Sequence, residues 1–241
     1  MNRILFEHDE IKDGVATFDG ARAEHVLRVL HGEVGQTLKT GELDGPAGTG
    51  EITAIDGARV TVRVKHEAEA LAPWVDLVLA PPRPRVMKRL LPQLAAMGVG
   101  RIVLVGAKKV EKDFWGATLL KESVYRPLLV DGLMQAGTTA VPVVSVERNF
   151  RKWIAGKLDE EFPSQCRVVA HPYGADGHLP EPKQGERLLL AIGPEGGWTD
   201  DEVASLEEKG FARFSLGNRI LRTDTAAIAL LAVLGAGLRL S

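Results

Sequence analysis

The chain has 241 residues, of which 45% are hydrophobic and 26% are charged, and its formal net charge is −2. This length can bury a full core in one large domain or in two, and no apolar run is long enough to cross a membrane. One cysteine excludes an internal disulfide and a cysteine-based zinc site, and six histidines without paired spacing predict no bound metal. The charged N-terminal stretch, MNRILFEHDE, does not look like a signal peptide, so we expect a cytoplasmic protein.

Short strands separated by glycine turns are expected over roughly the first seventy residues. One helix is predicted at 21–30, and strands are predicted at 14–20, 34–40, 50–55 and 58–66. Short strands at this spacing are typical of a small β-barrel.

The pattern changes near residue 72, where apolar runs begin to alternate with helical patterns. Strands are predicted at 74–80, 101–107, 141–146, 166–172, 187–193 and 212–217. Buried strands separated by helices indicate an α/β domain with a mostly parallel sheet covered on both faces. We therefore expect two domains, at 1–72 and 73–241.

A basic segment follows the first strand of the second domain. Residues 81–112 hold eight basic residues and one acidic residue, a local net charge of +7. Such a segment can form a basic surface that binds RNA phosphate, for which Arg83, Arg85, Lys88 and Arg89 are the candidates. The alternative is that these charges are spread over a solvated surface.

The stretch RLLLAIGPEGGWTDDEV, residues 187–203, joins a strand to a helix through a glycine loop. That layout is typical of a phosphate site, but the loop lacks a lysine and the GxGxxG spacing. Thr199 and Glu202 form a predicted capping box, which places three carboxylates in the first helical turn. Phosphate is therefore disfavoured, whereas a cationic ligand with a flat ring, such as S-adenosylmethionine, would be tolerated beside these glycines.

Two other strand ends carry polar residues, and the carboxyl ends of strands are where open α/β sheets bind ligands. His171 follows one predicted strand, and Arg219 and Arg222 follow another, just before a predicted helix start at Thr223. The last helix, 225–238, is apolar nearly all round and must be buried on several sides, either within its own fold or against a second subunit.

Together, IGPEGGWTDDEV and LGNRILRTDTAA resemble the C-terminal signature of the SPOUT methyltransferases, and more narrowly of the bacterial 16S ribosomal RNA uridine-N3 methyltransferase family. EHVLRVLHGEVGQTL, residues 24–38, is similar to that family's N-terminal segment. The resemblance implies an RNA-binding PUA-like β-barrel before an α/β domain with a C-terminal trefoil knot. It also implies a homodimer through the last helix, and methyl transfer from S-adenosylmethionine to a uridine N3 in the 16S rRNA of the small ribosomal subunit.

The same resemblance implies that three loops bind the cofactor. Their residues are His171, Pro172, Ile192, Gly193, Pro194, Glu195, Gly196, Gly197, Leu216, Gly217, Asn218, Arg219, Ile220, Leu221 and Arg222.

Methyl transfer to a uridine nitrogen requires positioning of the base and loss of the ring proton. We expect Arg219 and Arg222 to contact RNA phosphate or the uracil oxygens. Glu195 and Asp224 are the candidate bases, and the residues alone do not choose between them. The alternative for Asp224 is that it only caps its helix.

Two segments depart from the family pattern. Residues 92–99 lack its lysine and its Glu-Leu-Gly-Val run, and residues 134–138 lack its Glu-Gln-(Ser/Cys)-Gly-Arg run. These departures leave open a catalytically altered RNA-binding protein, or a methyltransferase with a different RNA target.

Overall fold

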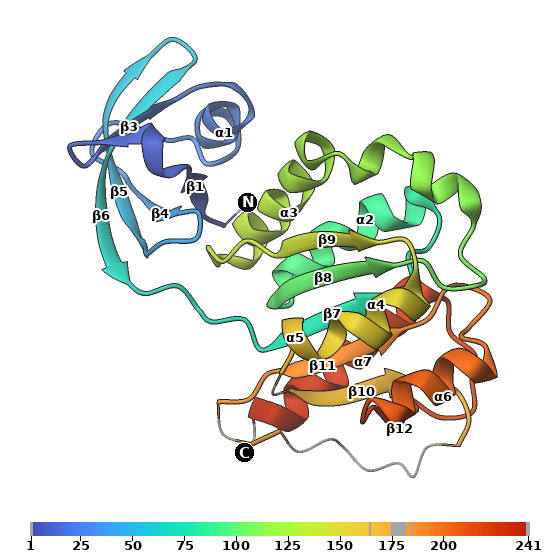
Figure 1. Cartoon of the computed structure of the whole chain (residues 1–241). Coiled ribbons are helices and arrows are strands. Elements are labelled where there is room, and N and C mark those ends of the chain that lie inside the picture. The colour runs from blue at the N-terminus through green and yellow to red at the C-terminus, as the bar shows by residue number, and fades with distance from the viewer. Residues whose placement is uncertain (1, 164, 175–181, 184, 240–241) are drawn as a thin grey trace. The chain divides into compact units, whose positions relative to one another are not determined.

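A computed structural model describes residues 2–163, 165–174, 182–183 and 185–239, which fold as two compact units (Figure 1). One unit comprises Met1–Ala72 and Leu129–Val141, and the other comprises Pro73–Leu128 and Pro142–Ser241. The division after Ala72 falls where the sequence pattern changes. The grouping of 129–141 with the first unit is not indicated by that pattern.

The first unit is built on a six-stranded sheet in the order β1-β4-β5-β6-β3-β2. Its strands are β1 (Ile4–Phe6), β2 (Ile11–Lys12), β3 (Val15–Phe18), β4 (Thr37–Glu42), β5 (Ala47–Asp56) and β6 (Arg59–Ala68). The predicted helix is α1 (Gly20–Glu24), which continues into the π-helical stretch η2 (His25–Val29). The four strands predicted here are confirmed, whereas β1 and β2 were not predicted because they are only three and two residues long.

The segment 129–141 joins this unit through backbone carbonyls and one buried side chain. The Arg3 N–H donates to Met134 O at 3.1 Å, and Arg3 Nε donates to Gly137 O at 3.0 Å. Thr139, which is fully buried, donates its hydroxyl to Gly45 O at 2.7 Å. The segment 134–138, where the chain departs from the family pattern, therefore has a packing role within the first unit.

The second unit holds a fully parallel six-stranded sheet in the order β12-β10-β11-β7-β8-β9. Its strands are β7 (Val75–Leu79), β8 (Val99–Val105), β9 (Val143–Glu147), β10 (Cys166–Ala170), β11 (Leu188–Ile192) and β12 (Ala212–Phe214). All six predicted strands are confirmed. Because every strand runs the same way, all the strand carboxyl ends lie at one edge.

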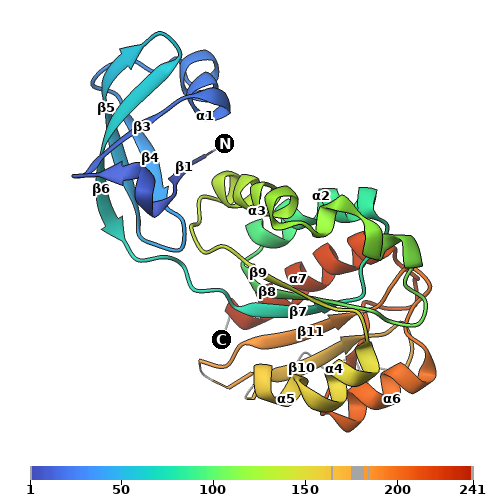
Figure 2. The ribbon, with the colours of Figure 1, turned by 45° about the horizontal axis from the view of Figure 1, so that its top comes forward.

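Helices cover both faces of this sheet, as the sequence predicts. The helices are α2 (Pro84–Ala96), α3 (Glu122–Ala136), α4 (Phe150–Gly156), α5 (Leu158–Glu161), α6 (Asp200–Glu208) and α7 (Thr223–Arg239), with 3-10 turns η3 (Lys112–Gly116) and η4 (Thr118–Leu120). A further 3-10 turn, η1 (His8–Glu10), belongs to the first unit. In the second unit, α2 and α7 lie on one face, and α4, α5 and α6 lie on the other (Figure 2). Among the described residues, no helix has both the length and the apolarity needed to span a bilayer.

Within this chain the last helix is buried on one side only. Ala227, Leu230, Leu231 and Leu234 of α7 are at most 2% exposed and face the core of the second unit. Ala232, like Thr225, Val233 and Ala236, is exposed, and none of these four residues is charged. The sequence left open whether this helix is buried by the chain's own fold or by a second subunit. In the single chain, one side of the helix is buried and the other side is exposed.

One carboxylate interrupts the apolar central strands. Asp76 in β7 is fully buried, and its Oδ2 accepts from Gln165 Nε2 at 2.7 Å. Its Oδ1 lies 3.4 Å from an Arg187 guanidinium nitrogen, and the Arg187 side chain is 38% exposed. Gln165 and Arg187 immediately precede β10 and β11, so this cluster holds three strand starts together.

Substitutions of the two partners of this ion pair should lower the free energy of unfolding by different amounts. Arg187→Met leaves a buried carboxylate without its cation and should lower the free energy of unfolding by about 3 kcal/mol, the lower end for a broken buried pair. Asp76→Asn leaves an arginine that can reach water, so it should cost about 1 kcal/mol. Urea unfolding measures both, and an Asp76→Asn cost equal to or above that of Arg187→Met would contradict this interpretation.

Candidate active site

The loops that follow the strands meet at the carboxyl edge of the parallel sheet. β11 is central among them, with β10 and β12 on one side and β7 and β8 on the other. The loop 193–197 after β11 can therefore form part of a site on either side. An edge of this kind is where α/β sheets bind their ligands.

The predicted capping box is confirmed and does more than cap α6. Thr199 is the N-cap residue, and its hydroxyl oxygen accepts from the Glu202 N–H. The Glu202 carboxylate is only 5% exposed and accepts from the Thr199 N–H at 2.9 Å. Its second oxygen accepts from the Lys108 N–H at 2.7 Å, which ties the loop after β8 to the start of α6. Of the three carboxylates in the first turn of α6, the Glu202 carboxylate is therefore bonded to backbone N–H groups of the protein itself.

A second bond joins the same two loops, because Lys109 Nζ donates to Gly196 O at 2.8 Å. Gly193 connects the loop to two other elements. Its carbonyl accepts from the Thr223 hydroxyl of α7 at 3.2 Å. A Cβ at Gly193 would lie 3.1 Å from Trp198, which is 5% exposed and packs on the Phe150 ring. Only glycine fits this position without displacing the indole ring.

The loops after β10 and β12 are joined to each other. The Ser215 hydroxyl lies 3.3 Å from Pro172 O and 3.2 Å from Gly217 O. The His171 N–H donates to Phe214 O at 3.1 Å, and His171 Nδ1 donates to Tyr173 O at 2.8 Å. The structure therefore brings the His171 and Leu216 segments together, as the strand-end pattern predicts.

Residues 216–222 are all exposed. Ile220 is 76% exposed, and Leu216 and Leu221 are each 37% exposed. In the described part of the chain, the Arg219 and Arg222 side chains make no ion pair or side-chain hydrogen bond that would hold them to the protein. This loop thus presents apolar and cationic groups outward.

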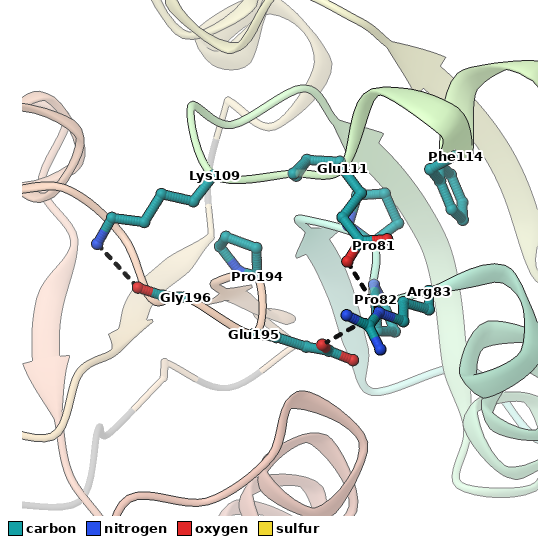
Figure 3. Close-up of a pocket in the computed structure, with 10 residues that line it drawn as sticks. Pro81, Pro82, Arg83, Lys109, Glu111, Phe114, Pro194, Glu195 and Gly196 are labelled. Carbon is teal, nitrogen blue, oxygen red and sulfur yellow. Dashed lines mark hydrogen bonds and ion pairs between the residues drawn. The ribbon is translucent and has the colours of Figure 1, made fainter.

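Both candidate bases lie beside an arginine from the basic segment. Glu195 Oε2 is 3.9 Å from Arg83 Nε, and the same nitrogen donates to Glu111 Oε1 at 2.8 Å (Figure 3). The hydrogen bond to Glu111, with the charges of Glu111 and Glu195, raises the pKa of the Arg83 guanidinium above its usual value. Arg83 therefore carries its positive charge at any physiological pH.

Asp224 differs from Glu195 in making a hydrogen bond within its own helix. Its Oδ2 is 4.0 Å from an Arg89 nitrogen, and its Oδ1 accepts from the Thr225 N–H at 2.9 Å, within the first turn of α7. The other two candidates for RNA binding in the basic segment, Arg85 and Lys88, are exposed on α2. The basic segment is therefore divided between ion-paired arginines and exposed cations.

A cavity of about 310 Å³ opens at the ends of β7, β8 and β11 (Figure 3). It is lined by Pro81, Pro82, Arg83, Lys109, Val110, Glu111, Phe114, Pro194, Glu195 and Gly196. Pro81, Pro82 and Glu111 were not predicted as site residues, because their position beside the loop after β11 depends on strand order. In the described residues, no group of three or more His, Cys, Asp or Glu side chains could hold a metal ion.

The segment 92–99 lies away from this edge. It forms the end of α2 and the entry to β8, at the amino edge of the sheet. Leu94, Ala95 and Val99 are buried, and the Met97 carbonyl accepts from Trp74 Nε1 at 2.7 Å. The departures from the family pattern in this segment thus affect packing at the edge opposite the loops.

Comparison with known proteins identifies the family. Residues 69–235 match the model of the RNA methyltransferase domain. The chain is 32% identical over 252 residues to ribosomal RNA small subunit methyltransferase E of Treponema pallidum, covering 97% of this chain and 90% of that protein.

Two solved structures share the fold. One is a Legionella pneumophila protein in complex with the cofactor SAM, with a TM-score of 0.79 and 24% identity, covering 98% of this chain and 97% of that one. The other is ribosomal RNA small subunit methyltransferase E from Neisseria gonorrhoeae bound to S-adenosyl methionine, with a TM-score of 0.75 and 22% identity, covering 99% and 98%. The chain therefore belongs to the RNA methyltransferase family, with the ribosomal RNA small subunit methyltransferases E.

Proposed function

We propose that this protein transfers a methyl group from S-adenosylmethionine to the N3 atom of a uridine in 16S ribosomal RNA of the small subunit. The observation that carries the proposal is the joining of three strand-end loops at one edge of the sheet. These loops are His171–Pro172, Ile192–Gly197 and Leu216–Arg222, which the resemblance assigns to the cofactor. The relatives named above support both the cofactor and the RNA substrate.

The residues of these loops fit S-adenosylmethionine. Gly197 and Gly217 have φ angles of +70° and +104°, and no other heavy atom lies within 4 Å of the place where their Cβ atoms would be. Backbone can therefore approach a flat ring closely there. Leu216 and Leu221 offer exposed apolar contacts, and Asp200 and Asp201 offer negative charge to a cationic ligand. When bound, the cofactor supplies a methyl group already activated on a positively charged sulfur.

The protein's own residues then contribute by positioning the RNA and by stabilising charge. Arg219 and Arg222 are exposed beside the cofactor loops, where they can bind RNA phosphate or uracil oxygens. Arg85 and Lys88 extend this cationic surface along α2. In the first unit, the six-stranded sheet is proposed to be the PUA-like RNA-binding barrel that the resemblance implies.

We also propose that the chain around β11 forms a trefoil knot, in a protein that works in the cytoplasm, where ribosomes are assembled. The strand order supports the knot. β11 lies between β10 and β7, and the chain then returns past β10 to form β12. Such threading is rare in proteins.

A homodimer through α7 is proposed from its uncharged exposed face. Apolar helix surface needs a partner, and Thr225, Ala232, Val233 and Ala236 have none within their own unit. The alternative function, RNA binding without catalysis, was motivated by the departures at 92–99 and 134–138. Those residues pack at the amino edge and in the first unit, which gives no support to a loss of catalysis.

The cofactor assignment can be tested with two glycines at opposite ends of β12. Gly217→Ala and Gly210→Ala both put a side chain at a positive φ, +104° and +81°, and both should cost about 1–2 kcal/mol in strain. Only Gly217 lies in a cofactor loop, so calorimetry should find S-adenosylmethionine binding at least tenfold weaker in Gly217→Ala and unchanged in Gly210→Ala. Equal affinity in both variants would remove this loop from the cofactor site.

The substrate assignment can be tested by mass-spectrometric mapping of ribosomal RNA from a strain that lacks the gene. A methyl-uridine in 16S rRNA should disappear and return with the wild-type gene. A gene with Lys152→Ala, which removes an exposed cation on α4, should also restore it, whereas Arg222→Ala should not. A modification map unchanged by loss of the gene would favour the RNA-binding alternative.

The dimer can be tested by placing a charge on α7. Val233 is 40% exposed on that helix, and Val143 is 60% exposed on the edge strand β9. Val233→Asp should give a monomer in sedimentation experiments, because an unpaired carboxylate cannot be buried cheaply. Val143→Asp should remain dimeric, and a wild-type chain that sediments as a monomer would refute the proposal.

A further inference from the structure

The cavity and the proposed cofactor loops lie on opposite sides of β11. The cofactor loops follow β10, β11 and β12, whereas the cavity is lined by residues that follow β7, β8 and β11. The loop 193–197 is the one element that both share. A base in the cavity and a cofactor bound by the other loops would therefore both contact this loop, beside which the methyl carbon and the accepting nitrogen must meet directly, about 3–3.5 Å apart.

The size of the cavity limits what it can hold. Its volume of about 310 Å³ is at the lower end of the range for small-molecule sites, roughly 300–1,000 Å³. A single nucleobase fits such a volume better than a complete nucleoside cofactor with its amino-acid tail. The walls also suit a flat ring, because Pro81, Pro82, Pro194 and Phe114 supply apolar surfaces.

The polar groups of the cavity distinguish among bases. Arg83 and Glu195 stand side by side, 3.9 Å apart, too far for a hydrogen bond to each other, so each can bind a ligand (Figure 3). The guanidinium offers donors and the carboxylate offers an acceptor. The uracil edge has the matching order, with a carbonyl oxygen beside the N3–H. Cytosine has an unprotonated N3 at this place, which would meet the carboxylate lone pairs unfavourably.

We propose that this cavity receives the target uracil, with Glu195 accepting the N3 proton and Arg83 donating to the adjacent carbonyl oxygen. The proposal rests on the proposed function and deepens it. It assigns the base to Glu195 rather than Asp224, which is not among the cavity residues and whose Oδ1 already accepts a hydrogen bond from the Thr225 N–H.

The chemical step balances with these residues alone. The N3–H bond breaks and its proton passes to the Glu195 carboxylate, while N3 forms a bond to the methyl carbon. The sulfur keeps the electron pair of the broken S–C bond and becomes a neutral thioether. Arg83 stabilises the negative charge that builds on the uracil oxygen. Glu195 is 44% exposed and afterwards returns its proton to water.

Glu111 and Lys109 act as positioning residues. Glu111 holds Arg83 at the mouth of the cavity through the 2.8 Å hydrogen bond, and Lys109 fixes the glycine loop through Gly196 O. Glu202 fixes the backbone next to Lys109, because its carboxylate accepts a hydrogen bond from the Lys108 N–H. An entering uracil therefore finds the donor and acceptor already placed.

The test uses the full-length protein, S-adenosylmethionine with a labelled methyl group, and 16S rRNA or small subunits from a strain lacking the gene. Glu195→Gln should slow single-turnover methylation by about 10²–10⁴-fold, the usual contribution of a general base. Arg83→Met should slow it by about 10²–10³-fold, the usual loss of one charge-stabilising donor. Both variants should bind S-adenosylmethionine within threefold of wild type by calorimetry.

The pH profile separates a catalytic role from a structural one. In Glu195→Gln the methylation rate should rise more steeply with pH than in wild type, because the uracil must then lose its proton to hydroxide. Lys152→Met and Glu208→Gln change exposed residues of α4 and α6 that have no role in the proposed site, so they serve as controls and should leave the rate and its pH profile unchanged.

Each contrary outcome has a distinct meaning. A wild-type methylation rate in Glu195→Gln would overturn the assignment of the base. A larger loss of rate in Asp224→Asn than in Glu195→Gln would do the same. Loss of S-adenosylmethionine binding in Arg83→Met would show that the cavity holds the cofactor, and would also overturn it. A wild-type protein that binds the cofactor but methylates no uridine would instead refute the proposed function.

Discussion

The rest of the site depends on the hydrogen bonds that the buried Glu202 carboxylate accepts from two separate loops. It accepts hydrogen bonds from the Thr199 backbone at the start of α6 and from the Lys108 backbone beyond β8. The positive end of α6 and these two donors offset the cost of its burial. By joining the loops after β8 and β11, it places Lys109 against Gly196 and fixes the opening between them.

The central position of β11 explains how one loop can serve two ligands. Its neighbours β10 and β12 contribute the proposed cofactor loops, and β7 and β8 contribute the cavity. Glycines at 193, 196 and 197 keep this wall thin, and Gly193 has no room for a side chain beside Trp198. Transfer requires N3 to contact the methyl carbon directly, about 3–3.5 Å away, so a loop with little side-chain bulk favours a close approach of the two ligands at its edge.

Much of this architecture can be predicted from local patterns, because apolar runs and capping residues act over a few positions. The second domain's strands and the Thr199–Glu202 capping box are examples. The bond between Glu202 and Lys108 spans 94 residues, and that between Arg83 and Glu111 spans 28. Such contacts depend on strand order, which periodicity does not encode. For the same reason, the packing of 129–141 with the first unit could not be predicted from the sequence.

The central claim is that the loop 193–197 contacts the cofactor on one side of β11 and the target base on the other. A crystal structure with S-adenosylhomocysteine and a short RNA containing the target uridine tests it most directly. The account predicts the cofactor product against the loops after β10 and β12, and a uracil in the cavity of about 310 Å³ with its N3 hydrogen-bonded to Glu195. A cofactor product lying inside that cavity, between Arg83 and Phe114, would contradict the account.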